Sequence, residues 1–327
     1  MEALIQKCML QCGFGTVKKA VTAVHGGLLH RMFRVETEQG LFAVKVLNGE
    51  MMKRPGVMHN MQVSEKAADT LRNTVPLMAA LPGGDSYVHF CNGIWFMVYP
   101  WLEGKSVFPP DITAEHCRIM GDILSEIHKA NIRVDGIQKE TPAEEEREWE
   151  KLFLLCKDDR CKEKFMSLKN KILYLEKTGD AAVTDLSEDQ LISHRDLDPK
   201  NVMWQGMQPV LIDWEAAGYV NPWQEVAECL FYWCDDGRGG LQKDCFQAFT
   251  AAYGKKHTLY GAPWQNALNA AYKGIVDWLY YNLKRAAGLE QESEVQTGID
   301  QVLQTLFTME NREKQNALLL EWLNEIT

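Results

Sequence analysis

The sequence predicts an α+β fold of two unequal lobes: a small N-terminal lobe built on an antiparallel β-sheet with one helix, and a larger, mainly helical C-terminal lobe. Three observations predict this class. Five short strand candidates and one helix candidate precede Pro100. After Gly104 the apolar residues recur mostly at helical spacing. One short hairpin candidate interrupts these helices. We therefore expect lobes at residues 1–100 and 101–327.

The strand candidates of the first lobe are short apolar runs bounded by turn residues. The run 41–47 is strongly β-prone and contains a single lysine, Lys45. Asn92-Gly93, the usual dipeptide of a tight hairpin, separates the last two candidates. Residues 62–73 gather their apolar side chains on one face and predict a helix. In chain order the strand candidates are 17–24, 31–37, 41–47, 87–91 and 94–99.

The second lobe is predicted to be helical except for one hairpin. Residues 113–129 are amphipathic, and helical periodicity continues from residue 223 almost to the C-terminus. The stretch 140–150 carries six glutamates and one arginine, which predicts a solvated helix start or a loop. The exception is 201–212, where two short strands flank the turn 205–208.

The composition is that of an ordinary globular protein: 327 residues, 46% hydrophobic and 24% charged, with a net charge of −10. It excludes disorder, collagen and coiled coil as the main class. The acidic balance disfavours nucleic acid or an anionic membrane as a partner. No run approaches the roughly 20 apolar residues of a spanning helix. The N-terminus lacks the features of a signal peptide, so we expect a cytoplasmic protein.

The cysteines give no sign of a metal site. There are nine, an odd number, and none forms a Cys-x-x-Cys pair. Cysteine is among the most often buried residue types, so we expect packed thiols.

Residues 193–215 contain the candidate catalytic and metal-binding residues. Asp196 is followed five residues later by Asn201, and Asp213 stands at the end of the next short strand. Phosphoryl transfer needs a carboxylate that orients the acceptor hydroxyl and takes its proton, together with oxygen ligands for magnesium. A hairpin between Asn201 and Asp213 would bring two such ligands side by side. The pattern therefore predicts a phosphotransferase.

The two motifs of this segment are His-x-Asp-x-x-x-x-Asn at residues 194–201 and Ile-Asp-Trp-Glu at residues 212–215. Together they resemble the aminoglycoside phosphotransferase and choline kinase group of protein-kinase-like enzymes. The resemblance implies a bilobal protein-kinase-like fold, Asp196 as the catalytic carboxylate, and Asn201 and Asp213 as ligands of Mg²⁺. It covers residues 17–235 well, whereas the rest matches only as generic helices.

The resemblance extends upstream to a lysine and a glutamate. An ammonium inside an apolar strand is costly unless it is paired, and Lys45 stands in such a strand. It matches the family lysine that holds the α- and β-phosphates. Glu65, in the following helix, fits the glutamate that pairs with this lysine. Glu50 is the competing candidate, but it lies close to the end of the strand.

The remaining nucleotide contacts are also implied by the resemblance. Gly26 and Gly27 stand between two strand candidates, where they are suited to cover phosphates. The segment 97–104 resembles the hinge between the lobes, so the Pro100 carbonyl and the Leu102 amide are expected to contact adenine. The expected cofactors are ATP, or GTP, and Mg²⁺.

Residues 194–197 also resemble the catalytic loop of protein kinases. Protein kinases need a long activation segment after the magnesium aspartate. Here a helical region opens at 221–223, only eight to ten residues after Asp213, and there is no Ala-Pro-Glu motif. A Gly-x-x-x-x-Gly-Lys-Ser/Thr motif is also absent, which excludes a P-loop kinase. We therefore predict a small, diffusible acceptor.

The acceptor candidates are aromatic and acidic residues of the second lobe. Aromatic faces and carboxylates together bind an ammonium group, which suits choline or an aminoglycoside. The alternative is that most tryptophans of this lobe belong to its core. Residues 1–100 hold ten Lys and Arg against seven Asp and Glu, whereas residues 101–327 hold 25 against 38. The candidates are Trp214, Glu215, Asp235, Asp277 and Tyr281.

We interpret the sequence as an ATP-dependent phosphotransferase that acts on a hydroxyl of a small molecule, most like an aminoglycoside phosphotransferase. A choline, ethanolamine or other metabolite kinase is the alternative within the fold. A non-catalytic kinase-like binding or structural protein is the alternative from another class, and the intact Lys45, Asp196, Asn201 and Asp213 argue against it. The expected partners are a nucleoside triphosphate and a small hydroxyl-bearing substrate, with a cationic substrate as one option.

Overall fold

The computed structural model describes residues 1–24, 30–139 and 147–326, so Gly26 and Gly27 lie outside the described residues. The chain divides into two compact units. The first comprises Met1–Phe108, Glu126–Lys139 and Ile192–Tyr219, and the second comprises Pro109–Ser125, Glu140–Leu191 and Val220–Thr327. The division into lobes at residue 100 stays a prediction.

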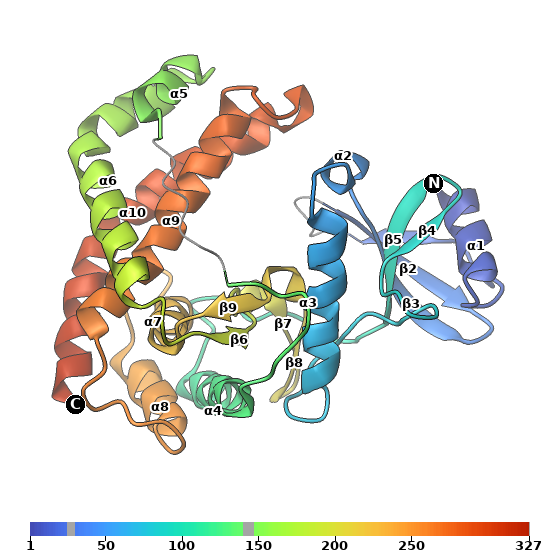
Figure 1. Cartoon of the computed structure of the whole chain (residues 1–327), viewed down its shortest axis with the longest axis horizontal. Coiled ribbons are helices and arrows are strands. Elements are labelled where there is room, and N and C mark those ends of the chain that lie inside the picture. The colour runs from blue at the N-terminus through green and yellow to red at the C-terminus, as the bar shows by residue number, and fades with distance from the viewer. Residues whose placement is uncertain (25–29, 140–146, 327) are drawn as a thin grey trace. The chain divides into compact units, whose positions relative to one another are not determined.

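The first unit is built on a five-stranded sheet of strand order β1-β2-β3-β5-β4, in which neighbours pair antiparallel (Figure 1). This confirms the predicted sheet, although only residues 22–24 of the predicted strand 17–24 form β1, and Val17 makes an isolated bridge to Thr37 of β2. The strands are β1 (Thr22–Val24), β2 (Arg31–Thr37), β3 (Gly40–Val46), β4 (His89–Cys91) and β5 (Ile94–Pro100). The helices are α1 (Glu2–Gln11), α2 (Gly49–Met52) and α3 (Val57–Leu71).

The two faces of the sheet pack against different helices. Side chains alternate along a strand, so residues two apart share a face. On β5, Phe96 and Val98 join a core cluster with Ile5 of α1, whereas Met97 and Tyr99 join a cluster with Met61 of α3. On β3, Val44 and Val46 belong to the α1 side. Lys45 lies between them and opposite Met97, and therefore faces α3.

The helix α1 was not predicted. Only Ile5, Cys8 and Met9 of its ten residues are buried, so its apolar pattern is short and weak. Its place depends on packing against the sheet, where Cys8 donates its thiol to the Cys91 carbonyl. Helix α3 begins earlier than the predicted residue 62, after Gly56 in a left-handed conformation at its N-cap (φ 80°).

The predicted hairpin is present in the first unit and is formed by β7 (Val202–Gln205) and β8 (Gln208–Leu211). The turn between them contains Gly206 at φ 59°, a left-handed conformation that glycine adopts without strain. A second two-stranded sheet pairs β6 (Leu191–Ser193) with β9 (Gly218–Val220). Two 3₁₀ turns flank the hairpin, η1 (Pro199–Asn201) and η2 (Trp214–Ala216).

The second unit is helical, as predicted. Helices α6, α9 and α10 pack on one another around a shared apolar core (Figure 1). The helices of the chain from residue 114 onward are α4 (Ala114–Ala130), α5 (Trp149–Leu155), α6 (Asp159–Asp185), α7 (Pro222–Trp233), α8 (Lys243–Tyr253), α9 (Trp264–Ala286) and α10 (Val295–Glu325), with a 3₁₀ turn η3 (Glu292–Glu294).

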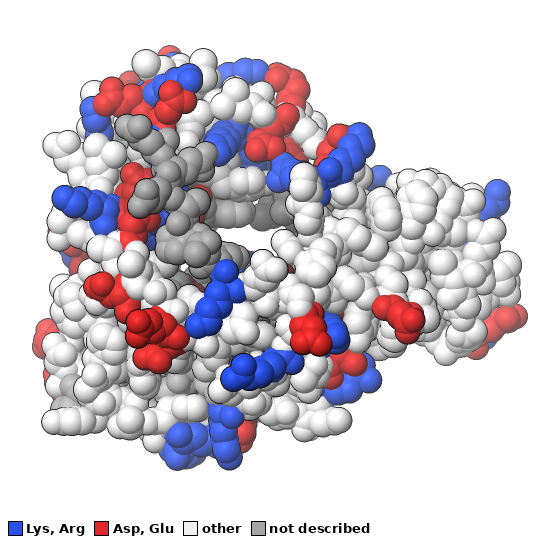
Figure 2. Space-filling view, in the orientation of Figure 1, with Lys and Arg blue, Asp and Glu red and all other residues white. Residues whose placement is uncertain are grey.

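The structure tests two expectations from the composition, one on the cysteines and one on the surface charges. Every cysteine is a free thiol, and all are buried except the half-buried Cys12, which confirms packed thiols. Figure 2 shows Lys and Arg beside Asp and Glu on the face in view, with no single basic stripe. Within the described residues, no helix has the length and apolar character that a bilayer crossing requires.

Candidate active site

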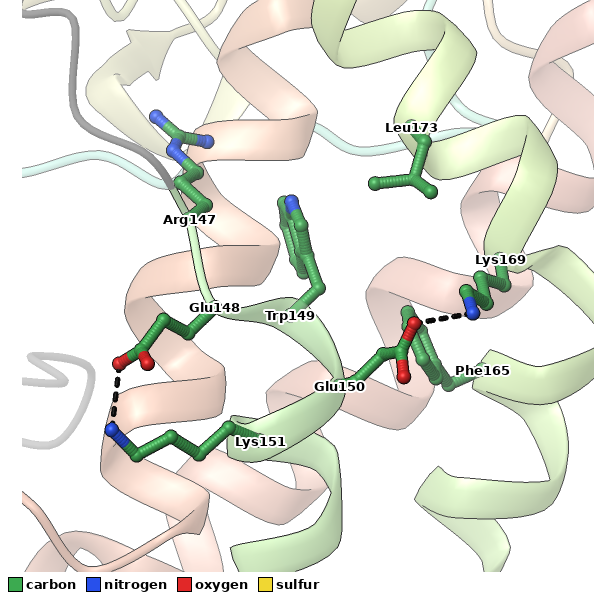
Figure 3. Close-up of a pocket in the computed structure, with 8 residues that line it drawn as sticks. All are labelled: Arg147, Glu148, Trp149, Glu150, Lys151, Phe165, Lys169 and Leu173. Carbon is green, nitrogen blue, oxygen red and sulfur yellow. Dashed lines mark hydrogen bonds and ion pairs between the residues drawn. The ribbon is translucent and has the colours of Figure 1, made fainter.

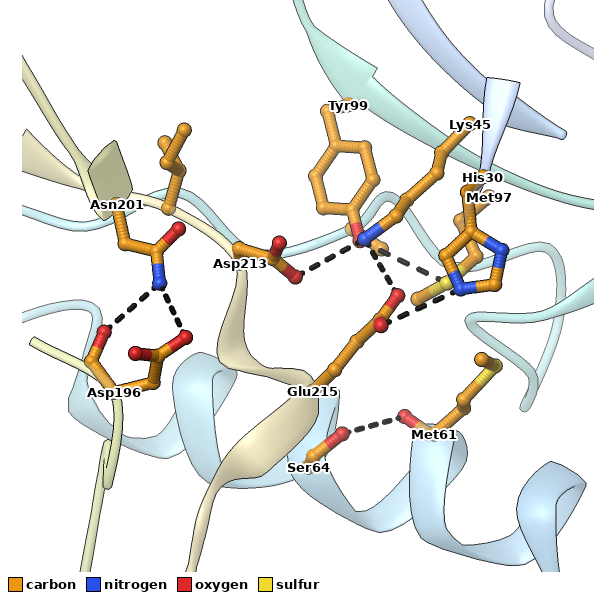
Figure 4. A network of polar contacts seen from close by, with 12 residues as sticks. His30, Lys45, Met61, Ser64, Met97, Tyr99, Asp196, Asn201, Asp213 and Glu215 are labelled. Atoms are coloured by element: carbon orange, nitrogen blue, oxygen red, sulfur yellow. Dashed lines mark hydrogen bonds and ion pairs between the residues drawn. The ribbon is translucent and has the colours of Figure 1, made fainter. Parts of the chain in front are cut away.

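Lys45 lies at the centre of a polar network in the first unit (Figure 4). Its side chain is only 11% exposed, so its ammonium needs paired charges. Nζ lies 3.0 Å from Oδ1 of Asp213 and 2.5 Å from Oε1 of Glu215. The buried lysine is therefore paired, but with carboxylates from the segment that follows the hairpin and not with the predicted Glu65.

These ion pairs shift the pKa values of Lys45 and Glu215 in opposite directions. Burial acts to lower the pKa of Lys45, but the charges of Asp213 and Glu215 outweigh it and hold that pKa above its usual value. Burial acts to raise the pKa of Glu215, but Lys45 and His30 outweigh it and lower the pKa to about 2. The lysine is thus a cation held between two carboxylates.

The hairpin brings Asn201 and Asp213 to neighbouring positions. Val202 is opposite Leu211, and the Ile212 N–H donates to the Asn201 carbonyl at 2.9 Å, which closes the end of the hairpin. The two predicted metal ligands therefore flank its open end. This is the local arrangement that their spacing predicts.

His194 orders the loop that carries Asp196. The Asp196 N–H donates to Nδ1 of His194 at 3.3 Å, so Nε2 carries the ring proton. Nε2 lies 3.0 Å from the carbonyl of Ile212 and donates to it. The ring of Trp214, 1% exposed, packs on His194 with ring centroids 4.6 Å apart. The loop is thus tied to the segment of Asp213.

Asp196 is held by Asn201. Nδ2 of Asn201 donates to both the carbonyl and Oδ2 of Asp196, each at 2.8 Å. Lys200 lies 3.3 Å from Oδ1 of Asp196. Because Asn201 uses its amide nitrogen in these bonds, its amide oxygen, the atom that a divalent cation binds, takes no part in them.

Two residues of the site adopt backbone conformations that are uncommon for their types. Arg195 and Asp213 have φ of 65° and 61°, in the left-handed region. Such residues cost about 1–3 kcal/mol each and persist where the surroundings hold them. Gly218 leaves room for the Arg195 side chain, because a Cβ at residue 218 would lie 2.7 Å from Nη1 of Arg195.

The predicted pairing of Glu65 with Lys45 is not among the ion pairs of the described residues. Glu65 is 1% exposed on α3. Its Oε2 accepts the Ala80 N–H at 2.6 Å, and its Oε1 accepts the Tyr99 hydroxyl at 2.8 Å. Both carboxylate oxygens are therefore engaged within the α3 side of the sheet, and Glu215 takes the ammonium instead.

The buried Glu65 predicts a pH-dependent stability. Desolvation raises the pKa of Glu65 from 4.5 to about 7, against the opposing effects of Ala80, Tyr99 and Lys45. Between these values the folded state keeps a proton that the unfolded chain releases, so stability falls as the pH rises through this window. Above the window the buried carboxylate costs on the order of 3 kcal/mol.

We expect Glu65→Gln to remove this dependence. The urea unfolding free energy of the variant, relative to the wild type, should rise between pH 5 and pH 8. Glu38→Gln, at an exposed position, is the matched control and should track the wild type at both values. A difference between Glu65→Gln and the wild type that stays constant with pH would contradict the argument.

The predicted adenine contacts lie at the end of the sheet. Pro100 ends β5 opposite Phe42, and the next residue, Trp101, donates its N–H to the Leu41 carbonyl at 2.9 Å. Leu102 is half-buried beyond it. Their contact with a nucleotide stays a prediction.

The acceptor candidates fall in different surroundings. Trp214 is buried against His194 and offers no open face, and Glu215 binds Lys45. The other three belong to the second unit. Asp235 accepts the Gly237 N–H at 2.8 Å, Asp277 pairs with Lys273 and, at 2.6 Å, with Arg147, and the Tyr281 ring lies 5.8 Å from that of Trp278.

A pocket of about 300 Å³ also lies in the second unit (Figure 3). Two ion pairs, Lys151 with Glu148 and Lys169 with Glu150, flank it. It contains none of the predicted site residues. Its lining residues are Arg147, Glu148, Trp149, Glu150, Lys151, Phe165, Lys169 and Leu173.

Residues 20–259 match the profile of the phosphotransferase enzyme family. No curated protein matches the sequence significantly. A spectinomycin phosphotransferase solved with ADP and spectinomycin is similar in structure, at 12% identity over 94% of this chain and 98% of that chain, with a TM-score of 0.67.

Two further solved structures are similar. One is an amicoumacin kinase solved with AMP-PNP and Ca²⁺, at 11% identity over 90% of this chain and 88% of that chain, with a TM-score of 0.57. The other is an ethanolamine kinase from Plasmodium vivax, at 12% identity over 87% and 80%, with a TM-score of 0.53. These likenesses confirm the fold that the motifs implied.

Proposed function

Because this chain belongs to the phosphotransferase enzyme family, we propose that it transfers the γ-phosphate of ATP, or of GTP, to a hydroxyl group of a small molecule. The observation that carries the proposal is the network of the first unit, in which Lys45 pairs with Asp213 and Asn201 holds Asp196. A cation for the phosphates, oxygen ligands for a metal and a carboxylate for the acceptor are the parts that phosphoryl transfer needs.

Each side chain has a distinct task in this mechanism. Lys45 binds the phosphate tail of the nucleotide and fixes it for in-line transfer. Asp196 accepts a hydrogen bond from the acceptor hydroxyl, orients it and takes its proton as the bond to phosphorus forms. Asn201 keeps the carboxylate of Asp196 in position through its amide nitrogen.

Asn201 and Asp213 fit Mg²⁺. Their amide and carboxylate oxygens are the hard ligands that Mg²⁺ prefers, and two protein ligands suffice when phosphates supply others. A Mg²⁺ ion held by these two residues would neutralise negative charge on the phosphates of the nucleotide. The similar amicoumacin kinase was solved with a nucleotide analogue and a divalent cation, which supports this assignment.

For the acceptor we propose an aminoglycoside-like, amine-bearing alcohol, with a choline, ethanolamine or other metabolite kinase as the alternative. The proteins of similar structure include kinases for both kinds of compound, such as a spectinomycin phosphotransferase and an ethanolamine kinase. Asp235, Asp277 and Tyr281 remain candidates to bind a cationic acceptor.

We also propose a cytoplasmic location, which the free thiols of all nine cysteines favour.

A coupled ADP-release assay across aminoglycosides, choline, ethanolamine, homoserine, macrolides and sugars tests the proposal. We expect Mg²⁺-dependent turnover with one class, and none after chelation with EDTA. If no compound is phosphorylated and Mg·ATP does not bind, the non-catalytic binding protein becomes the better description.

A further inference from the structure

We propose that Glu215, and not Glu65, is the carboxylate that positions Lys45, and that His30 in turn positions Glu215. The inference rests on the proposed function for the task of Lys45, namely binding the phosphates. It assigns two positioning residues: Glu215, which the sequence suggests for the acceptor, and His30, which the sequence does not single out.

The first argument is where the oxygens of each glutamate are used. Oε1 of Glu215 lies 2.5 Å from Nζ of Lys45 (Figure 4). Both oxygens of Glu65 accept other hydrogen bonds, from the Ala80 N–H and the Tyr99 hydroxyl. These two bonds orient the Glu65 carboxylate toward Ala80 and Tyr99, and the described residues show no ion pair between Glu65 and Lys45.

The second argument is the tautomer of His30. The Asn48 N–H lies 3.1 Å from Nδ1 of His30, and a backbone N–H can only donate. The ring proton is therefore on Nε2, which lies 3.4 Å from Oε2 of Glu215. The His30 side chain is 4% exposed, so its orientation is fixed by packing. Glu215 thus lies within ion-pair distance of the lysine through one oxygen, and its other oxygen lies 3.4 Å from Nε2 of His30.

The third argument is the backbone that carries Glu215. Asp213 adopts a left-handed conformation at the start of η2, and η2 packs against α3. The neighbouring Trp214 is buried on His194. The two residues that precede Glu215 are therefore held in place. If Asp213 were engaged by a metal ion, Glu215 would remain as the carboxylate beside Lys45.

Binding of Mg·ADP, measured by calorimetry, tests the inference with two isosteric variants. We expect Glu215→Gln to raise the Kd about tenfold, because the negative charge paired with Lys45 is lost. Glu65→Gln should change it less than about threefold, because an amide can accept from the Ala80 N–H and donate to the Tyr99 oxygen. Glu215→Asp keeps the charge and should recover most of the affinity.

A double-mutant cycle separates positioning from general destabilisation. If Glu215 acts through the lysine, Glu215→Gln should add little to the loss caused by Lys45→Met. His30→Phe should weaken Mg·ADP binding less than Glu215→Gln, and should have no effect in the Glu215→Gln background. Loss of affinity in Glu65→Gln together with wild-type affinity in Glu215→Gln would overturn the inference and leave the proposed function intact.

The same double-mutant cycle can also be measured by urea unfolding, which requires no bound nucleotide. The coupling of Lys45→Met with Glu215→Gln should exceed its coupling with Glu65→Gln by about tenfold in the unfolding constant, as expected for residues in direct contact. If the wild type does not bind Mg·ADP, the proposed function fails. A larger coupling to Glu65 would then overturn the assignment of the pair as well.

Discussion

Replacing Asp196 by Asn is expected to lower kcat about 10³-fold, within the range that general bases contribute. An amide has nearly the shape of the carboxylate and can keep a hydrogen bond with Asn201, so the loop should stay in place. It cannot take the proton of the acceptor hydroxyl. The effect should therefore fall on kcat, with little change in the KM for ATP.

The measurement is ADP release at saturating ATP with the acceptor found by the screen. Asp135→Asn, at an exposed turn of the same unit, is the matched control and should keep wild-type turnover. The urea midpoint of each variant shows whether the fold is retained. Wild-type turnover in a folded Asp196→Asn variant would disprove the proposed mechanism.

Replacing Asp213 by Asn is expected to lower kcat about 10²–10³-fold, the cost of removing one group that stabilises charge in the transition state. The variant loses the carboxylate that we propose as a ligand for Mg²⁺, which is also one of the two carboxylates beside Lys45. It should also need more Mg²⁺ to reach half of its remaining rate.

A titration of the rate against Mg²⁺ at fixed ATP, for the wild type and Asp213→Asn, checks this. Asp85→Asn is an exposed control in the first unit. Since Glu215 still holds the lysine, Mg-free ADP should bind the variant almost as tightly as it binds the wild type. An unchanged Mg²⁺ requirement would exclude Asp213 as a metal ligand.

The elements that the sequence predicts well are those with a strong local pattern. Strand β3 is an apolar run around one lysine, and the hairpin β7–β8 has its turn between two short β-prone segments. Neighbouring residues alone favour these conformations, so periodicity finds them. Helix α1 and the start of β1 were not predicted correctly, because short elements contain too few apolar residues to give a clear pattern. Their conformation depends on packing within the sheet and against it.

Part of the candidate active site can likewise be predicted from local sequence. The spacing of Asp196, Asn201 and Asp213 determines by itself that an Asp–Asn pair and a second Asp meet at one hairpin, because that hairpin is local. The order of these residues after Lys45 also determines the family and the reaction class.

Only the tertiary structure decided which carboxylate meets the lysine. Glu65 is 20 residues from Lys45 in the sequence and Glu215 is 170 residues away, yet Glu215 makes the contact. That choice depends on how β3, α3 and η2 pack, and on Ala80 and Tyr99, which orient the carboxylate of Glu65. Local propensity contains no information on such distant partners, because they meet only when the chain has folded.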